Sequence, residues 1–239
     1  MTRIALAVGI TLIIAWYALA ALPWPAQAMT AVLLVLLPAL AVAQARALAE
    51  LRPDALSRIP VYVSSTTTLW ILAFLCVVAA DSSGFTPGII GLRNVAPVVF
   101  IAWVVVVVGA AAVLLAVGKI LNVQESELLT HLLPVTRRER AVFVLLAITA
   151  GICEEVVFRG FLIPSLTYVI GSTLAAALLS SVLFGVLHAY QSPFGAARAA
   201  LLGFALAAPL LSAGTILPSI VAHIAIDLIG GLWLVRDAA

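Results

Sequence analysis

Several stretches of the chain run for about twenty residues with almost no charged side chain, and this feature limits the possible folds most. Residues 95–118, for instance, contain no Asp, Glu, Lys or Arg. A membrane-spanning helix needs about 20 mostly apolar residues. Lipid offers the backbone no hydrogen-bond partners, so only helices and closed barrels can cross it. Barrel strands are short and alternate in polarity, so the continuous runs predict an all-α membrane helix bundle.

The composition favours the same class of protein. Only 9% of the residues are charged, whereas 65% are hydrophobic. Soluble domains carry about 25% charged residues, so lipid has to solvate most of the outer surface of this chain. The formal net charge of +2 is too small to favour a nucleic-acid partner. We therefore expect the lipid bilayer, and no nucleic acid, as a partner.

Eight apolar runs predict a polytopic bundle of about eight transmembrane helices. We expect them to form a single membrane domain over residues 1–239, with four variable helices in residues 1–118 and the functional core in residues 140–235. The runs cover residues 4–22, 29–43, 61–80, 95–118, 141–161, 171–190, 196–212 and 217–235.

Prolines and glycines indicate where these helices bend or approach one another. Pro38 lies inside the second run and predicts a kink, because proline cannot donate a backbone hydrogen bond. Gly185, Gly230 and Gly231 lie in later runs, where small residues permit close contact between membrane helices.

The Lys and Arg residues predict the orientation, because cytoplasmic loops carry an excess of them. With eight helices and a cytoplasmic N-terminus, only Arg93 and Arg159 of the twelve basic residues fall on the outer side. Both termini are then cytoplasmic. Glu154 lies about 21 Å along its helix from Arg140, at 1.5 Å per residue, which is nearer the outer leaflet. The basic residues on the cytoplasmic side are Arg3, Arg46, Arg52, Arg58, Lys119, Arg137, Arg138, Arg140, Arg198 and Arg236.

Three charged residues interrupt the fifth apolar run. A charge inside the membrane costs about 3 kcal/mol or more, so it needs a partner or a function. Glu155 and Arg159 are four residues apart and share a helix face, so they are expected to pair. Glu154 is rotated by about 100° from Glu155. One carboxylate is thus neutralised locally, and the other is left for a partner on another helix.

Two later runs supply such partners. His188 lies one turn after Phe184, and His223 shares a helix face with Asp227. None of these polar faces can point to lipid, so we expect them to converge with Glu154. A carboxylate beside an imidazole can deprotonate a water, and a second imidazole can stabilise the oxyanion that forms when water attacks an amide. The same set of side chains could alternatively hold a zinc ion with an open position.

Two other functions would use the same residues. Buried Glu, His and Asp side chains form proton or ion relays in transporters; the repeated halves and broken helices typical of transporters are not evident in this sequence. A non-catalytic immunity or scaffold protein is the other alternative. The presence of Glu154, His188 and His223 together argues against it.

The three motifs together resemble those of the CAAX prenyl endopeptidase and bacteriocin-processing protease family, also called CPBP or Abi. Its pattern is Glu-Glu-x-x-x-Arg, then Phe-x-x-x-His, then His-x-x-x-Asn or Asp, and it occurs here in order within residues 154–227. The resemblance implies an intramembrane protease, either of the glutamic type or a zinc-dependent metalloendopeptidase. By resemblance the catalytic residues are Glu154, His188, His223 and Asp227, and the supporting residues are Glu155, Arg159 and Phe184.

The resemblance also implies roles for these residues. Glu154 would activate the water together with His188, and His223 with Asp227 would form the oxyanion side. Prenyl-protein processors of eukaryotes carry Asn at the last position, and an ionised Asp cannot donate a hydrogen bond. Asp227 could therefore orient His223, donate when protonated, or bind metal. The preferred mechanism needs no cofactor; the alternative is zinc held by Glu154, His188, His223 and Asp227.

The family further implies the kind of substrate and the location. We expect a peptide or protein substrate with a membrane-anchored, lipid-modified or C-terminal sorting segment, or a leader peptide. We expect the protein in the inner (plasma) membrane of a bacterium.

Overall fold

The computed structural model describes residues 2–49, 56–123 and 126–232, and within these ranges it contains helices and turns but no strand. The predicted all-α membrane bundle is confirmed. Residues 233–235, the end of the last predicted run and of the predicted core, lie outside the described residues. The elements are α1 (Thr2–Ala18), α2 (Trp24–Ala31), η1 (Val32–Leu36), α3 (Leu37–Ala49), α4 (Arg58–Ser82), α5 (Pro97–Ile120), α6 (Glu127–His131), α7 (Arg137–Glu155), η3 (Val156–Leu162), α8 (Ile163–Ile170), α9 (Thr173–Leu187), η4 (Ala189–Gln191), α10 (Pro193–Ala213) and α11 (Leu217–Leu232).

Five helical segments are long and apolar enough to cross a membrane, and three further apolar helices are shorter. Each of the eight predicted runs overlaps one of these segments, so the positions of the apolar helices are confirmed. How many of them cross the membrane stays a prediction. The long segments are Trp24–Leu48, Arg58–Ser82, Pro97–Ile120, Arg137–Ile170 and Pro193–Ala213, and the short ones are Leu6–Ala18, Thr173–Leu187 and Leu217–Leu232.

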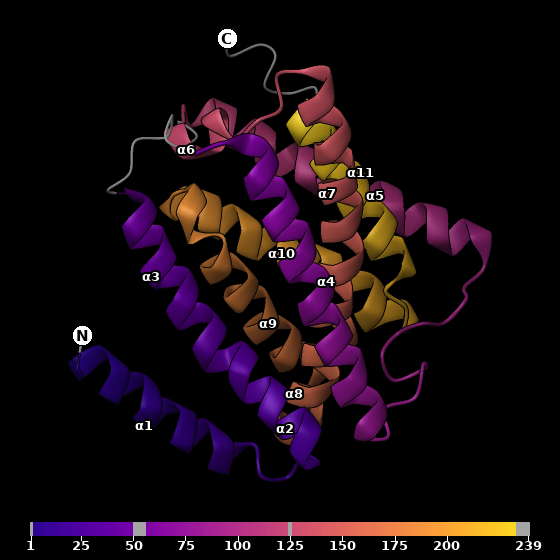
Figure 1. Cartoon of the computed structure of the whole chain (residues 1–239). Coiled ribbons are helices and arrows are strands. Elements are labelled where there is room, and N and C mark those ends of the chain that lie inside the picture. Colours follow the sequence, from indigo (N-terminus) through magenta and orange to yellow (C-terminus); the bar gives the residue numbers. More distant parts are fainter. Residues whose placement is uncertain (1, 50–55, 124–125, 233–239) are drawn as a thin grey trace.

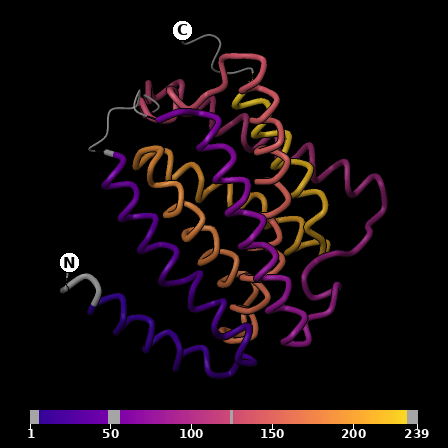
Figure 2. Tube along the Cα trace, in the orientation of Figure 1, coloured from indigo at the N-terminus to yellow at the C-terminus, as the bar shows by residue number. Residues whose placement is uncertain are grey.

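Helix α7 contacts helices from both the N-terminal and the C-terminal parts of the chain. It packs against α4 and α11, while α9 packs against α10 and α8 (Figure 1). The course of the chain in Figure 2 shows α1 along one edge, beside the rod formed by α2 and α3. Large apolar side chains point outward from the bundle; Phe74 is 66% exposed and Val98 is 73% exposed. Such an outer surface suits contact with lipid chains.

Two helical rods contain a wide π-helical segment, and each segment ends two residues before a proline. Val32–Leu36 precedes Pro38, and Val156–Leu162 precedes Pro164. Proline has no N–H for the carbonyl four residues earlier, so we attribute the wider hydrogen-bond spacing of the π segment to this missing bond. The π-helical segment lies just before Pro38, where the sequence predicts a kink; the kink itself stays a prediction. The rod that begins at α7 continues through η3 and α8 to Ile170, beyond the predicted end at residue 161.

Helices α7 and α11 run antiparallel in close contact, and glycines make this contact possible. A Cβ at Gly151 would lie 2.9 Å from the backbone nitrogen of Ile224, and one at Gly231 would collide with the ring of Phe143. Gly185 similarly faces the Ala196 carbonyl oxygen of α10, at 2.6 Å from the position of its missing Cβ. The expected close contacts at Gly185 and Gly231 are thus confirmed. The expectation for Gly230 was wrong, because none of the described residues lies within 4 Å of the position of its Cβ.

Replacing Gly151 with Ala should destabilise the protein by about 1–3 kcal/mol, the usual cost of overpacking, because the methyl group meets backbone of α11. Thermal unfolding in detergent, followed by circular dichroism, measures this effect. Gly109→Ala is the matched control, since Gly109 on α5 has open space around it. Equal unfolding temperatures for the two variants would contradict the close contact.

Candidate active site

The helix that carries both glutamates, α7, begins at a capping box. Thr136 Oγ1 accepts a hydrogen bond from the backbone N–H of Glu139 at 3.2 Å, and the Glu139 carboxylate accepts one from the backbone N–H of Thr136 at 2.8 Å. This reciprocal capping box fixes the first turn of a helix. The helix then carries Glu154 and Glu155 in its last turn.

Arg159 and Glu155 form the ion pair expected from their spacing, and both are fully buried. Arg159 Nη1 donates to Glu155 Oε1 at 2.9 Å, and Nη2 donates to the backbone carbonyl of Gly203 on α10 at 2.7 Å. The guanidinium also lies over the ring of Phe184, 4.9 Å from its centroid. The pair therefore joins α7, η3, α9 and α10 at one point.

His223 of α11 is held by the same carboxylate. Its Nδ1 lies 2.8 Å from Glu155 Oε1. Since Glu155 also binds the Arg159 cation, it acts as an ionised acceptor, and His223 Nδ1 carries the hydrogen. The other ring nitrogen, Nε2, consequently faces away from Glu155, toward Glu154 and Asp227.

Glu154 and Asp227 lie on either side of this imidazole nitrogen. Glu154 Oε2 and Asp227 Oδ2 are each 3.8 Å from His223 Nε2. These distances are too long for direct hydrogen bonds, and a water beside the three groups could bind to more than one of them. Glu154 Oε2 is buried and has no hydrogen-bond partner among the described residues. A buried oxygen without a partner is costly, so this atom is ready to accept from a bound molecule.

His188 lies at the C-terminal end of α9 and approaches the cluster through Phe184. Its Nδ1 lies 2.7 Å from the carbonyl oxygen of Phe184, which can only accept, so Nδ1 donates and Nε2 is left as an acceptor. The ring of Phe184 contacts both imidazoles, with centroid distances of 4.5 Å to His188 and 6.1 Å to His223. Within the described part of the chain, His188 makes no hydrogen bond or ion pair with Glu154; the imidazole beside Glu154 is that of His223.

Exposure increases across the cluster in one direction. The side chains of Glu155, His223, Glu154 and Asp227 are 0%, 6%, 16% and 32% exposed, respectively. Because α11 is antiparallel to α7, the step from His223 to Asp227 leads toward the end of α7 that carries Arg137. The turn η4, which follows His188, contacts α6 just before that end. The accessible side of the cluster therefore faces the Arg137 end of the bundle.

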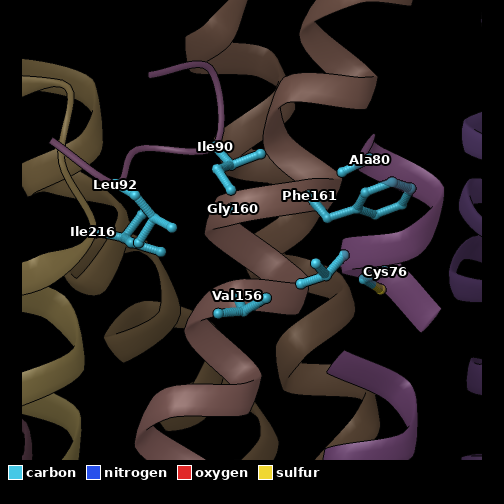
Figure 3. Close-up of a pocket in the computed structure, with 9 residues that line it drawn as sticks. Cys76, Ala80, Ile90, Leu92, Val156, Gly160, Phe161 and Ile216 are labelled. Atoms are coloured by element: carbon cyan, nitrogen blue, oxygen red, sulfur yellow. The ribbon is translucent and has the colours of Figure 1, made fainter. Parts of the chain in front are cut away.

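A different face of η3 lines a small apolar pocket (Figure 3). The pocket measures about 40 Å³, and Val156, Gly160 and Phe161 from η3 meet Cys76 of α4 and Ile216 there. Its lining has no charged or hydroxyl side chain, and the buried thiol of Cys76 is its one titratable group among the described residues. The polar cluster and this pocket thus occupy separate sides of one helical segment.

Zinc held by these side chains is the alternative to the mechanism without a cofactor. Zinc ligands in proteins lie about 2.0–2.3 Å from the ion. Among the described residues, no three His, Cys, Asp or Glu side chains are placed so that they could hold a metal ion. We therefore derive no step through zinc.

The structure thus brings together all seven residues singled out by sequence. Glu154, Glu155, Arg159, His223 and Asp227 contact or face one another directly, and Phe184 links them to His188. Sequence reasoning missed the Gly203 carbonyl, which has no side-chain signal, and the bond between Glu155 and His223. It also did not single out Tyr190, whose ring stacks on His188 two positions earlier in the chain.

A polytopic helical membrane protein with a buried carboxylate, imidazole and guanidinium cluster is the class that fold and site define. Residues 137–229 match the family described as type II CAAX prenyl endopeptidase Rce1-like. The match covers less than half of the chain, contains the whole cluster, and confirms the resemblance to the CAAX-type intramembrane proteases predicted from the motifs. Searches of curated proteins and of solved structures found no match.

Proposed function

We propose that the protein is an intramembrane endopeptidase of the CAAX-protease type that uses a glutamate-activated water. Its substrate carries a membrane-anchored, lipid-modified or C-terminal sorting segment. The observation that carries this proposal is the state of Glu154, whose Oε2 is buried beside His223 and has no hydrogen-bond partner in the described part of the chain. A carboxylate in this setting is a suitable general base for a water, and the residues around it belong to the segment that matches a protease family.

In the proposed reaction, ionised Glu154 takes one proton from a water while the water oxygen forms a bond to the carbonyl carbon of the scissile amide. The π electrons of the carbonyl move to its oxygen. When the tetrahedral intermediate collapses, the C–N bond breaks, and the proton held by Glu154 passes to the leaving nitrogen. His188 contributes its free Nε2, which can accept the second hydrogen of the water and so orient it.

His223 and Asp227 form the side of the site where negative charge develops. His223 is held in place through Nδ1 by the pair of Glu155 and Arg159, so its Nε2 has a fixed direction. A fixed polar group aimed at the developing oxyanion lowers the barrier more than a mobile one. Asp227, 3.8 Å from Nε2, supports the charged form of the imidazole in this proposal.

The same proposal includes orientation and location. With both termini in the cytoplasm of a bacterium and the protein in its inner membrane, the Arg137 end is cytoplasmic, as the Lys and Arg distribution predicts. The accessible side of the cluster faces that end. Substrates would then enter from the cytoplasmic half of the bilayer, although Glu154 lies deep along α7.

Cleavage in proteoliposomes tests the proposed function. The purified full-length protein is expected to cut a quenched fluorescent peptide with a lipid-modified C-terminal segment, and empty liposomes are not. The same vesicles loaded with a pH-sensitive dye should show no proton flux, because a protease has no relay across the bilayer. Proton flux without cleavage would instead support the transporter alternative.

Treatment with a chelator addresses the role of zinc. Since no three described side chains are placed to hold a metal ion, we expect dialysis against 1,10-phenanthroline to leave the cleavage rate within about twofold of the untreated rate. A loss that added Zn²⁺ restores would contradict the metal-free mechanism and favour the zinc alternative.

A further inference from the structure

Hydrolysis of an amide needs a hydrogen-bond donor for the developing oxyanion, and most donors of the cluster are already in use. Both terminal nitrogens of Arg159 bind protein oxygens. His188 Nδ1 is bound to the Phe184 carbonyl, and His223 Nδ1 is bound to Glu155. The carboxylates of Glu154 and Asp227 can only accept when ionised. The N–H of His223 Nε2 is available when the imidazole is protonated, and the remaining N–H groups of Arg159 belong to a fully buried side chain. The cluster itself therefore offers the oxyanion few donors.

Tyr190 lies beside this group and has a hydroxyl that is not used as a donor. It is a half-buried residue of the turn η4, and its ring stacks over His188, with centroids 6.1 Å apart and planes at 30°. Gln191 Nε2 donates to the Tyr190 hydroxyl oxygen at 3.3 Å. The phenol therefore accepts one hydrogen bond, and no acceptor for its own hydrogen occurs among the described residues.

The phenol keeps its hydrogen at neutral pH beside an imidazole of the cluster, since its ring stacks over His188. An ordinary phenol, with a pKa near 10, is protonated at neutral pH. Tyr190 is thus a neutral donor beside His188, and a neutral donor does not have to give up its proton to act.

The turn that holds Tyr190 is a constrained piece of backbone. Ser192 ends the turn with φ of 149°, a conformation that L residues rarely adopt, and its Oγ accepts from the Gly195 N–H at 2.9 Å. The turn packs against α3, α6 and α10. Strained backbone residues cluster at functional sites, and Ser192 lies two residues after Tyr190.

We propose that the Tyr190 hydroxyl donates a hydrogen bond to the carbonyl oxygen of the scissile amide and stabilises the oxyanion of the tetrahedral intermediate. No proton is transferred and no bond to Tyr190 forms; the interaction strengthens as negative charge develops on the oxygen. This role rests on the proposed function, because it concerns the same hydrolysis. It makes Tyr190 a catalytic residue outside the three motifs.

Tyr190→Phe, which removes only the hydroxyl, tests this role in proteoliposomes. The loss of one oxyanion donor costs about 10²- to 10³-fold in kcat, so we expect kcat to fall by that factor with KM unchanged within about twofold. Tyr168→Phe is the matched control, because Tyr168 on α8 is 63% exposed and should keep the wild-type kcat.

A second variant separates a donor role from a packing role. In Asp227→Asn an amide N–H becomes available beside His223, so adding Tyr190→Phe to that variant should lower kcat by a smaller factor than in the wild type. A wild-type kcat in Tyr190→Phe, or a change confined to KM, would overturn the inference. If Glu154→Gln is inactive while Tyr190→Phe is fully active, this inference fails and the proposed function stands; if Glu154→Gln cleaves normally, the proposed function itself fails.

Discussion

Replacing Glu154 with Gln is expected to lower the rate of peptide cleavage in proteoliposomes by about 10²- to 10⁴-fold, the contribution of a well-placed general base. Gln has nearly the same shape and still accepts a hydrogen bond, but it cannot take a proton from water. The change also leaves the buried pair of Glu155 and Arg159 untouched. The fold should therefore survive, with the loss confined to kcat.

Glu127→Gln provides the matched control for this experiment. It makes the same chemical change at an exposed glutamate in the first turn of α6, outside the cluster, and it should leave kcat unchanged. Wild-type cleavage by the Glu154→Gln variant would exclude Glu154 as the base, because no amide side chain can fill that role.

Arg159→Met is expected to have the largest effect on stability, about 3–5 kcal/mol, which is typical when one partner of a buried ion pair is removed. The change leaves the Glu155 carboxylate in the core without its cation and the Gly203 carbonyl without its donor. His223 also loses the support that fixes Glu155. Unfolding of the purified protein in mixed micelles, titrated with sodium dodecyl sulfate, measures the loss.

Removing the second charge as well should recover part of this stability. The double variant Arg159→Met with Glu155→Gln no longer contains an uncompensated buried charge, so it should be more stable than Arg159→Met alone. Arg138→Met, at an exposed position in the first turn of α7, should change stability little. A double variant less stable than Arg159→Met alone would contradict the importance of the unpaired carboxylate.

Much of the fold and the Glu155–Arg159 pair of the site could be predicted from the sequence, because both depend on local spacing. The apolar runs located each apolar helix, since hydrocarbon forces the backbone into continuous helices. The four-residue spacing of Glu155 and Arg159 was enough to predict their pair. The start of α7 was placed too late, at residue 141, because charges at Arg137 and Arg140 exclude these residues from an apolar run although they form its capped first turn.

The contacts between helices could not be derived in the same way. Whether Glu154 or Glu155 meets His223 depends on the vertical register of α7 against α11, which is set by the close approach of Gly151 to Ile224 and of Gly231 to Phe143. The sequence therefore indicated that acid and imidazole groups meet, but not which atoms do so. Similarly, the side from which the cluster is exposed follows from the antiparallel packing and from no motif.

The most direct test of the central claim, that Glu154 activates a water and is not itself the nucleophile, is a single-turnover cleavage in H₂¹⁸O with enzyme in excess over peptide. Mass spectrometry of the new C-terminus should show one ¹⁸O atom in each product molecule, because the attacking oxygen comes from solvent. A product that contains ¹⁶O from the enzyme in this first turnover would reveal an anhydride formed on the carboxylate and would contradict the water mechanism.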